Sequence, residues 1–121
     1  MTLNEIEKLL QEAAGGIDRI YLHWTGCDSD VVNLPDYTVI IARDGEYHAL
    51  HDDFTERLAH TWRRNSRSIG IAMACCKDAV CYYDSPDGID LGDEPPTEAQ
   101  IEAMSMLVAK AEEILELTAD D

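Results

Sequence analysis

The stretch "IYLHWTGC", residues 20–27, predicts a short strand that carries a histidine near its end. Side chains alternate along a strand, so the even-numbered residues point to one face and the odd-numbered residues to the other. Both faces carry bulky or β-branched side chains, which indicates a central strand covered on both sides. His23 is then either a polar residue held in a core or a zinc ligand placed by a rigid strand, since imidazole commonly binds zinc.

Two other regions of the sequence predict strands. Tyr37–Arg43 and Glu46–Leu50 flank Asp44-Gly45, and this dipeptide is the strongest short signal for a hairpin. The run "SIGIAMACC", residues 68–76, predicts a second buried strand. A loop rich in Asp, Gly and Pro then extends from Lys77 to Pro96, and loops of this length often have a function.

Each end of the chain predicts a helix. Thr2 and Glu5 have the spacing of a capping box, and so do Thr97 and Gln100. The first helix is expected to stop at Gly15, because glycine accepts the left-handed conformation at a helix end. The inner stripe of the last helix is predicted to consist of Ile101, Met104, Val108, Ala111 and Leu115, with Leu107 and Ile114 beside it. With three to five strands, these helices predict an α/β or α+β domain in which helices pack on a sheet.

The composition limits the classes of function. The 121 residues suit a single domain, and 45% of them are hydrophobic. A net charge of -16 would repel phosphate backbones, so nucleic acid is not expected as a partner, and solubility is the ordinary reason for such acidity. No apolar run reaches the roughly 18 residues of a membrane span, and the N-terminus lacks the pattern of a secretory signal. We therefore expect no membrane span and a protein that is made in the cytoplasm.

The four cysteines do not form a recognisable ligand pattern. Cys27, Cys75, Cys76 and Cys81 match no C-x-x-C pair, so free thiols in a reducing compartment are expected. Neighbouring residues on a strand point to opposite faces, which argues against a shared ligand role for Cys75 and Cys76.

A few further side chains could carry chemistry. His60 lies in a loop that enters a strand, where site residues often collect, or it is a solvated loop histidine. Tyr37 could donate a hydrogen bond to a developing oxyanion, or it is a half-buried aromatic residue. An arginine cluster could bind carboxylates or offset the local acidity; its members are Arg63, Arg64 and Arg67. The other two histidines are expected at the surface; they are His48 and His51.

Four segments in order resemble the type 2 N-acetylmuramoyl-L-alanine amidase family, which includes amidase-type phage lysozymes and the peptidoglycan recognition proteins. The segments are "IYLHWTG", "YTVIIARDGEYHAL", "LAHTWRRNSRSIGIAMA" and "PPTEAQIEAMSMLVAKAEEIL". Their order and spacing match the family over nearly the whole chain, although no single segment is specific alone. The resemblance implies a central mixed β-sheet flanked by helices, with residues 1–121 forming one amidase-like domain.

The resemblance also implies a zinc-dependent peptidoglycan hydrolase that cleaves the amide bond between N-acetylmuramic acid and L-alanine. His23 matches the first zinc ligand and Tyr37 the tyrosine that assists the reaction, although Thr38 follows where the family has histidine. In such a site three ligands leave a fourth position for a water molecule, whose pKa the metal lowers. Substrate contacts with peptidoglycan or muropeptides are implied for His60, Thr61, Asn65 and Trp24.

The sequence departs from the family pattern after the long helix. The family's second zinc histidine and third ligand follow that helix, whereas this sequence shows neither before Asp121. We therefore expect a C-terminally incomplete domain with an exposed patch that a second copy or another segment covers. Cys27 and Cys75 do not follow the family pattern as replacement ligands, and a zinc site requires three correctly placed ligands.

Two functions stay open at this point. One is the zinc amidase, which would act at the cell wall without a signal peptide, as phage endolysins do. The other is a non-catalytic peptidoglycan-binding module with a degenerate zinc site.

Overall fold

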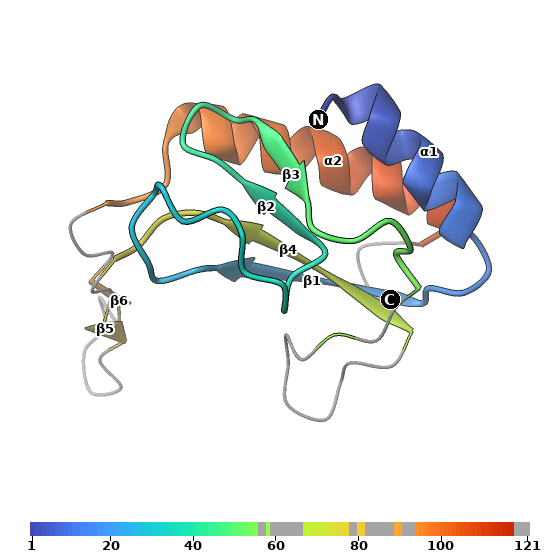
Figure 1. Ribbon diagram of the computed structural model, residues 1–121, viewed down its shortest axis with the longest axis horizontal. Coiled ribbons are helices and arrows are strands. Elements are labelled where there is room, and N and C mark those ends of the chain that lie inside the picture. Colours follow the sequence, from blue (N-terminus) through green and yellow to red (C-terminus); the bar gives the residue numbers. More distant parts are fainter. Residues whose placement is uncertain (56–57, 59–66, 78–79, 82–88, 91–93, 118–121) are drawn as a thin grey trace.

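A mixed four-stranded sheet with two helices on one side forms the body of the molecule (Figure 1). The computed structural model describes residues 1–55, 58, 67–77, 80–81, 89–90 and 94–117. Its elements are α1 (Leu3–Ala13), β1 (Arg19–Trp24), β2 (Val39–Ile41), β3 (Tyr47–Ala49), β4 (Ser68–Met73), β5 (Val80–Cys81), β6 (Ile89–Asp90) and α2 (Glu98–Leu115). The strand order is β1-β4-β2-β3; the first three strands are parallel and β3 is antiparallel. This arrangement confirms the predicted α/β fold with a mixed sheet.

Both helices begin at the capping boxes that the sequence predicts. The Thr2 hydroxyl oxygen accepts a hydrogen bond from the Glu5 amide at 3.3 Å, and the Thr97 hydroxyl oxygen accepts one from the Gln100 amide at 3.1 Å. Gly15 follows the end of α1 with φ +89°, as expected. α2 ends instead at Glu116, which adopts the left-handed conformation without a glycine.

The main core lies between the two helices and the sheet face that they cover. Tyr47 joins these layers, because its hydroxyl donates a 2.6 Å hydrogen bond to the carbonyl oxygen of Ala103. The other buried residues of this core include Ile6, Leu10, Val39, Ile41, Phe54, Ile69, Ile71, Leu107 and Ala111. No helix in the described part of the chain has the length and apolar character that crossing a membrane requires.

The inner face of α2 differs from the prediction at its N-terminal end. Ile101 was expected to face the core but is 51% exposed, whereas the polar Gln100 is 1% exposed. The Gln100 amide nitrogen donates to the carbonyl oxygens of Ile41 at 3.2 Å and Ala74 at 2.9 Å. A buried side chain with these bonds satisfies the backbone where β2 and β4 end, so the helix turns glutamine inward and isoleucine outward.

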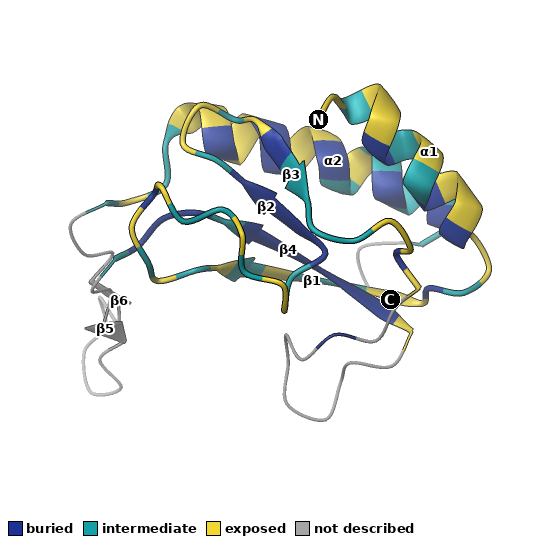
Figure 2. Ribbon diagram, in the orientation of Figure 1, coloured by how far each residue is buried: buried dark blue, intermediate teal, exposed yellow. Residues whose placement is uncertain are grey.

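β1 was predicted to be a central strand, and this prediction is wrong. β4 lies between β1 and β2, which leaves β1 at an edge of the sheet among the strands that the structure describes. Figure 2 shows the contrast, since β2 and β4 are buried while parts of β1 are exposed. Bulky residues on both faces of a strand indicate that other residues pack above and below the sheet. They do not indicate whether another strand pairs with each of its two edges.

The hairpin of β2 and β3 forms around Asp44-Gly45 as predicted. Gly45 has φ +89°, and a Cβ atom there would lie 3.0 Å from the carbonyl oxygen of Ala99 at the start of α2. The Thr97 hydroxyl also donates to the carbonyl oxygen of Arg43 at 2.7 Å. The turn is therefore fixed against the first turn of α2, and both its conformation and its close approach require glycine.

Replacing Gln100 by leucine, which is similar in size, should lower the free energy of unfolding by about 1–3 kcal/mol. The substitution removes the Gln100 donor to the carbonyl oxygen of Ala74 and the acceptor of the Thr97 amide, while the carbonyl oxygen of Ile41 keeps its bond from the Ala74 amide. Urea unfolding followed by circular dichroism measures the change, with the exposed Gln11→Leu as the matched control. If the free energy of unfolding falls by less than about 0.5 kcal/mol, the hydrogen bonds of the Gln100 side chain contribute little to stability.

Candidate functional site

His23 and Tyr37 lie together on the sheet face that the helices leave open. The strand register places His23 of β1 beside Ala72 of β4, and Ala72 beside Ile40 of β2. The ring centres of His23 and Tyr37 are 5.3 Å apart, with their planes inclined at 50°. The small side chain of Ala72 leaves room for this contact, so the two residues that the sequence singled out for chemistry are brought together.

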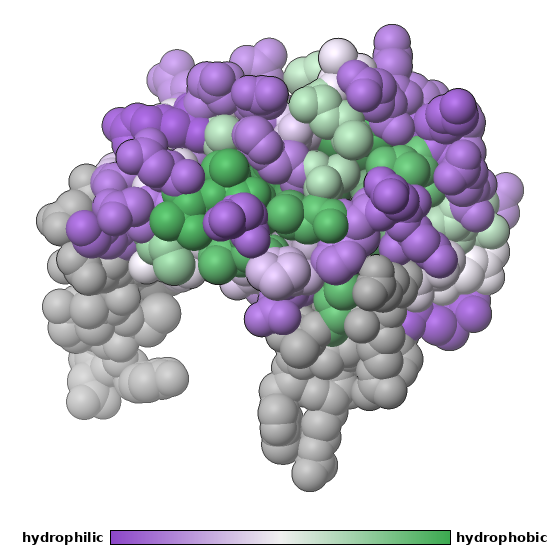
Figure 3. Space-filling model, in the orientation of Figure 1, coloured by the Kyte–Doolittle hydropathy of each residue, from purple (hydrophilic) through white to green (hydrophobic). Residues whose placement is uncertain are grey.

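A second apolar cluster forms the floor beneath these two rings. Its buried members are Ile40, Ala72 and Ala74, against which Tyr37 and three aliphatic residues pack. In the view of Figure 3, hydrophobic side chains gather over β2 and β4, and hydrophilic side chains surround them. An apolar floor beneath polar groups is typical of ligand sites, because the polar groups then fix the orientation of what binds.

Burial shifts the pKa values of both rings. Desolvation lowers the pKa of His23, because it disfavours the charged imidazolium. Desolvation also raises the pKa of Tyr37, and the neighbouring Cys27 and Asp36 raise it further. At neutral pH the site therefore presents a neutral imidazole, which can act as a ligand or base, and a protonated phenol, which can donate a hydrogen bond.

Thr38 fixes the backbone next to Tyr37. It is 1% exposed, and its hydroxyl oxygen accepts a 3.1 Å hydrogen bond from the Gly70 amide. The Thr38 amide in turn donates to the carbonyl oxygen of Gly70 at 2.8 Å. This residue stands where the resemblance implies histidine, and here it attaches the start of β2 to β4.

The described residues do not complete a metal site around His23. Across the described ranges, no group of three His, Cys, Asp or Glu side chains is placed to hold a metal ion. Cys75 is buried, and desolvation together with its contact with Cys76 raises its pKa to about 12, so it is a poor thiolate donor. A three-ligand zinc site therefore does not fit the residues that the structure describes.

The prediction that Cys75 and Cys76 point to opposite faces of a strand is wrong. They follow β4 rather than lying on it, and Cys76 has φ +63°. The strand alternation that would separate them does not apply, and their sulfur atoms lie 3.3 Å apart. Both thiols are free and buried, as expected.

The sequence matches the N-acetylmuramoyl-L-alanine amidase family over residues 13–121. The chain belongs to this family. It matches no curated protein. The family match, the mixed sheet and the position of His23 near the end of β1 agree with the resemblance seen in the sequence.

Of the other predicted site residues of this amidase-family chain, the structure describes only Trp24. Trp24 follows His23 on β1 and is 37% exposed, but strand alternation directs its ring to the opposite face. Both residues line a hollow of about 460 Å³ at the end of the strand. Three proposed substrate contacts lie outside the described residues: His60, Thr61 and Asn65.

The arginine cluster of the amidase-family domain is described in part. Arg67 forms an ion pair with Asp18 at 2.6 Å and donates to the carbonyl oxygen of Gly15 at 2.8 Å. Hydrogen bonding to Arg67 lowers the pKa of Asp18. Arg67 thus holds the start of β1, while Arg63 and Arg64 lie outside the described residues.

Polar loops at the carboxyl ends of the parallel strands were missed by the sequence analysis. A Glu94 carboxylate oxygen accepts a 2.9 Å hydrogen bond from the Ser29 amide and lies 3.7 Å from the Arg43 guanidinium. Lys77 forms a 3.2 Å ion pair with Asp28 beside them. These residues are far apart in the sequence, and only the parallel arrangement of β1, β4 and β2 brings their loops to one edge.

The pKa of His23 should lie below its ordinary value of about 6.5 in an NMR titration of the folded chain. A lowered pKa means that the unfolded chain binds the proton more readily, so stability should fall as the pH drops from about 6.5 through the folded pKa. His23→Gln should remove that part of the pH dependence, while His48→Gln serves as a control for a histidine on β3, outside the contact of His23 with Tyr37. A His23 pKa at or above 6.5 would contradict this account.

Proposed function

We propose that the chain acts on peptidoglycan and hydrolyses the amide bond between N-acetylmuramic acid and L-alanine. The observation that carries this proposal is the family match over residues 13–121, and the contact between His23 and Tyr37 supports it. In the reaction, water adds to the amide carbon and the carbon–nitrogen bond breaks. The products are the muramoyl carboxylic acid and a peptide with a free alanine amine.

The proposed role of Tyr37 follows from its protonated state. Because burial raises its pKa, the phenol keeps its proton at neutral pH and can donate it in a hydrogen bond to the carbonyl oxygen as negative charge develops there. The phenol binds and orients the substrate oxygen and needs no change in its own protonation. The apolar floor beneath it limits water around that hydrogen bond, which strengthens it.

The proposed role of His23 is that of a metal ligand, and it rests on the family match. The structure describes one such ligand, whereas a catalytic zinc site uses three, so we assign no step of the reaction to zinc. Trp24, His60, Thr61 and Asn65 are proposed substrate contacts on the same ground. Action at the cell wall is a further part of the proposal.

A second candidate function is peptidoglycan binding without cleavage. The incomplete ligand set among the described residues favours it. The His23–Tyr37 face would then bind a muropeptide as a surface, with the phenol and the imidazole as hydrogen-bonding groups.

The purified chain should cleave a muropeptide when zinc is supplied, giving a peptide that begins with L-alanine in mass spectrometry. Tyr37→Phe should lower kcat by about 10²–10³-fold, because it removes one donor to the developing oxyanion. Tyr21→Phe is the matched control, since Tyr21 lies on the His23 face of β1 and outside the ring contact of His23 with Tyr37.

Intact muropeptides with a folded, zinc-supplied chain would contradict the amidase proposal. Calorimetry on the same sample then tests the second candidate function, binding without cleavage. This function predicts a heat of muropeptide binding, and Tyr37→Phe should reduce that heat. An absence of both cleavage and binding at millimolar muropeptide would contradict both functions.

A further inference from the structure

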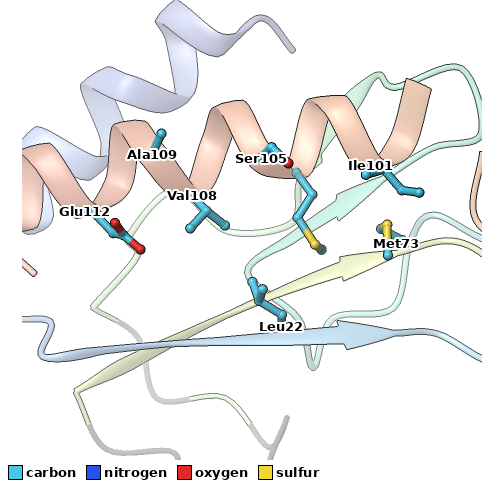
Figure 4. A pocket seen from close by; sticks show the side chains of 8 residues that line it. Leu22, Met73, Ile101, Ser105, Val108, Ala109 and Glu112 are labelled. Carbon is cyan, nitrogen blue, oxygen red and sulfur yellow. The ribbon is translucent and has the colours of Figure 1, made fainter. Parts of the chain in front are cut away.

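Two cysteine side chains meet directly after the central strand β4. This strand ends at Met73, which lines an apolar groove beneath α2 (Figure 4). Cys75 and Cys76 follow, and their sulfur atoms lie 3.3 Å apart. The two residues are 1% and 0% exposed, and neither takes part in the contact of His23 with Tyr37. The chain thus holds two touching thiols to which the proposed amidase reaction gives no role.

The backbone conformation of Cys76 is what brings the two sulfur atoms together. Neighbouring residues on an extended strand point to opposite faces, which would separate their side chains. Cys76 instead has φ +63°, in the left-handed region that residues other than glycine rarely adopt. Residues held in such conformations cluster at functional and switch regions of proteins. A cysteine at this position therefore calls for a reason beyond simple packing.

The peptide group that joins the two cysteines is bonded at both of its polar atoms. Its oxygen, which belongs to Cys75, accepts a 3.0 Å hydrogen bond from the Gly26 amide. Its N–H, which belongs to Cys76, donates to the carbonyl oxygen of Glu94. The Glu94 carboxylate in turn accepts a 2.9 Å hydrogen bond from the Ser29 amide. This single peptide group therefore connects the loop that follows β1 to the segment around Glu94.

The two thiols are close to the geometry of a covalent bond. The sulfur atoms of a disulfide lie about 2.05 Å apart, so these two have to approach by little more than about 1 Å. The Cα atoms of neighbouring residues are about 3.8 Å apart across a trans peptide, which is shorter than the usual span of about 4.4–6.8 Å in disulfides. A bond between them is therefore strained, and strained disulfides are readily reduced.

We propose that Cys75 and Cys76 are a modification site at which a peroxide closes a reversible disulfide between neighbouring residues. Hydrogen peroxide oxidises one thiol to a sulfenic acid and leaves as one water molecule. The sulfur atom of the second thiol then attacks the sulfenic sulfur, and the S–S bond forms. Hydroxide leaves and takes up the proton of the second thiol as another water molecule. A dithiol reductant reverses the reaction by exchange and is itself oxidised to a disulfide.

Burial determines which oxidants react and how fast. Desolvation and the contact with Cys76 raise the pKa of Cys75 to about 12, and the thiolate is the form that reacts. Oxidation is therefore slow at neutral pH and becomes faster as the pH rises. Both sulfur atoms are covered, which favours a small peroxide over a bulky disulfide such as glutathione disulfide. Cys27 is only partly buried and is the thiol that a bulky reagent reaches more easily.

Closing the disulfide ring acts on the loops through the shared peptide group. The ring contains this peptide, so a change in its tilt moves the hydrogen bonds to Gly26 and Glu94. Gly26 follows His23 by three residues along the chain. The oxidation state of the two cysteines is therefore coupled to the loop that continues from the His23 strand. The bond itself requires no amidase activity, so it forms even in a chain that cleaves no muropeptide.

Mass spectrometry of the peroxide-treated, folded chain tests the disulfide. After the peroxide is removed, the chain is unfolded in iodoacetamide, and trypsin releases residues 68–77, which lie between Arg67 and the cleavage site after Lys77. This peptide should have lost two hydrogen atoms and carry no acetamide group, and dithiothreitol before alkylation should restore two acetamide groups. A sulfoxide at Met73 adds an oxygen atom and is distinguished by its mass. Cys76→Ala is the matched control, and its peptide should carry one acetamide group.

NMR of the backbone amides tests the coupling to the loop. The Gly26 amide signal should move on oxidation and return with dithiothreitol, and it should not move in peroxide-treated Cys76→Ala. The Gly16 amide, which donates to the Ala13 carbonyl oxygen after α1, should stay in place. Cys27→Ala should leave the yield of the disulfide unchanged, because Cys27 has no part in it.

Three results would overturn the proposal. One is a folded chain that keeps both thiols under conditions that oxidise the unfolded chain, since the pair would then be out of reach of peroxide. Another is a different product, either a sulfinic acid at Cys75 or Cys76 or a disulfide that joins one of them to Cys27 or Cys81. The third is a Gly26 signal that does not respond to the disulfide, which would remove the coupling to the loop.

Discussion

The pairing of β4 with β1 on one side and β2 on the other is the constraint on which the rest of the structure depends. Its six residues carry the hydrogen bonds of two parallel ladders, and they align His23, Ala72 and Ile40 in one row across the sheet. Any shift of one residue along β4 would move its side chains to the other face. The contact between His23 and Tyr37, the apolar floor and the helix-covered core all follow from that one register.

α2 depends on the same strands through polar contacts as well as apolar ones. Gln100 bonds to the backbone at the ends of β2 and β4, and Gly45 lets the hairpin turn approach the first turn of the helix. These contacts accompany a rotation of α2 that turns Ile101 outward, where it lines an apolar groove together with Leu22 of β1. A single buried amide thus helps to create the apolar groove.

The two faces of the sheet have separate roles. One face packs under α1 and α2, while the other carries His23 and Tyr37 of the proposed site. Among the strands that the structure describes, β1 lies at one edge of this sheet.

The sequence by itself determined the local elements, because their signals lie within a few residues of one another. The capping boxes at Thr2 and Thr97, the Asp44-Gly45 hairpin and the apolar run of β4 were all predicted, and the family resemblance came from motifs in order. The tertiary structure alone decided the position of β1 at the edge, the inward turn of Gln100 and the contact of two cysteine sulfur atoms. It also brought the loops of Asp28, Arg43 and Glu94 together. These features depend on strand order and on backbone partners far away in the chain, which a pattern of neighbouring residues does not encode.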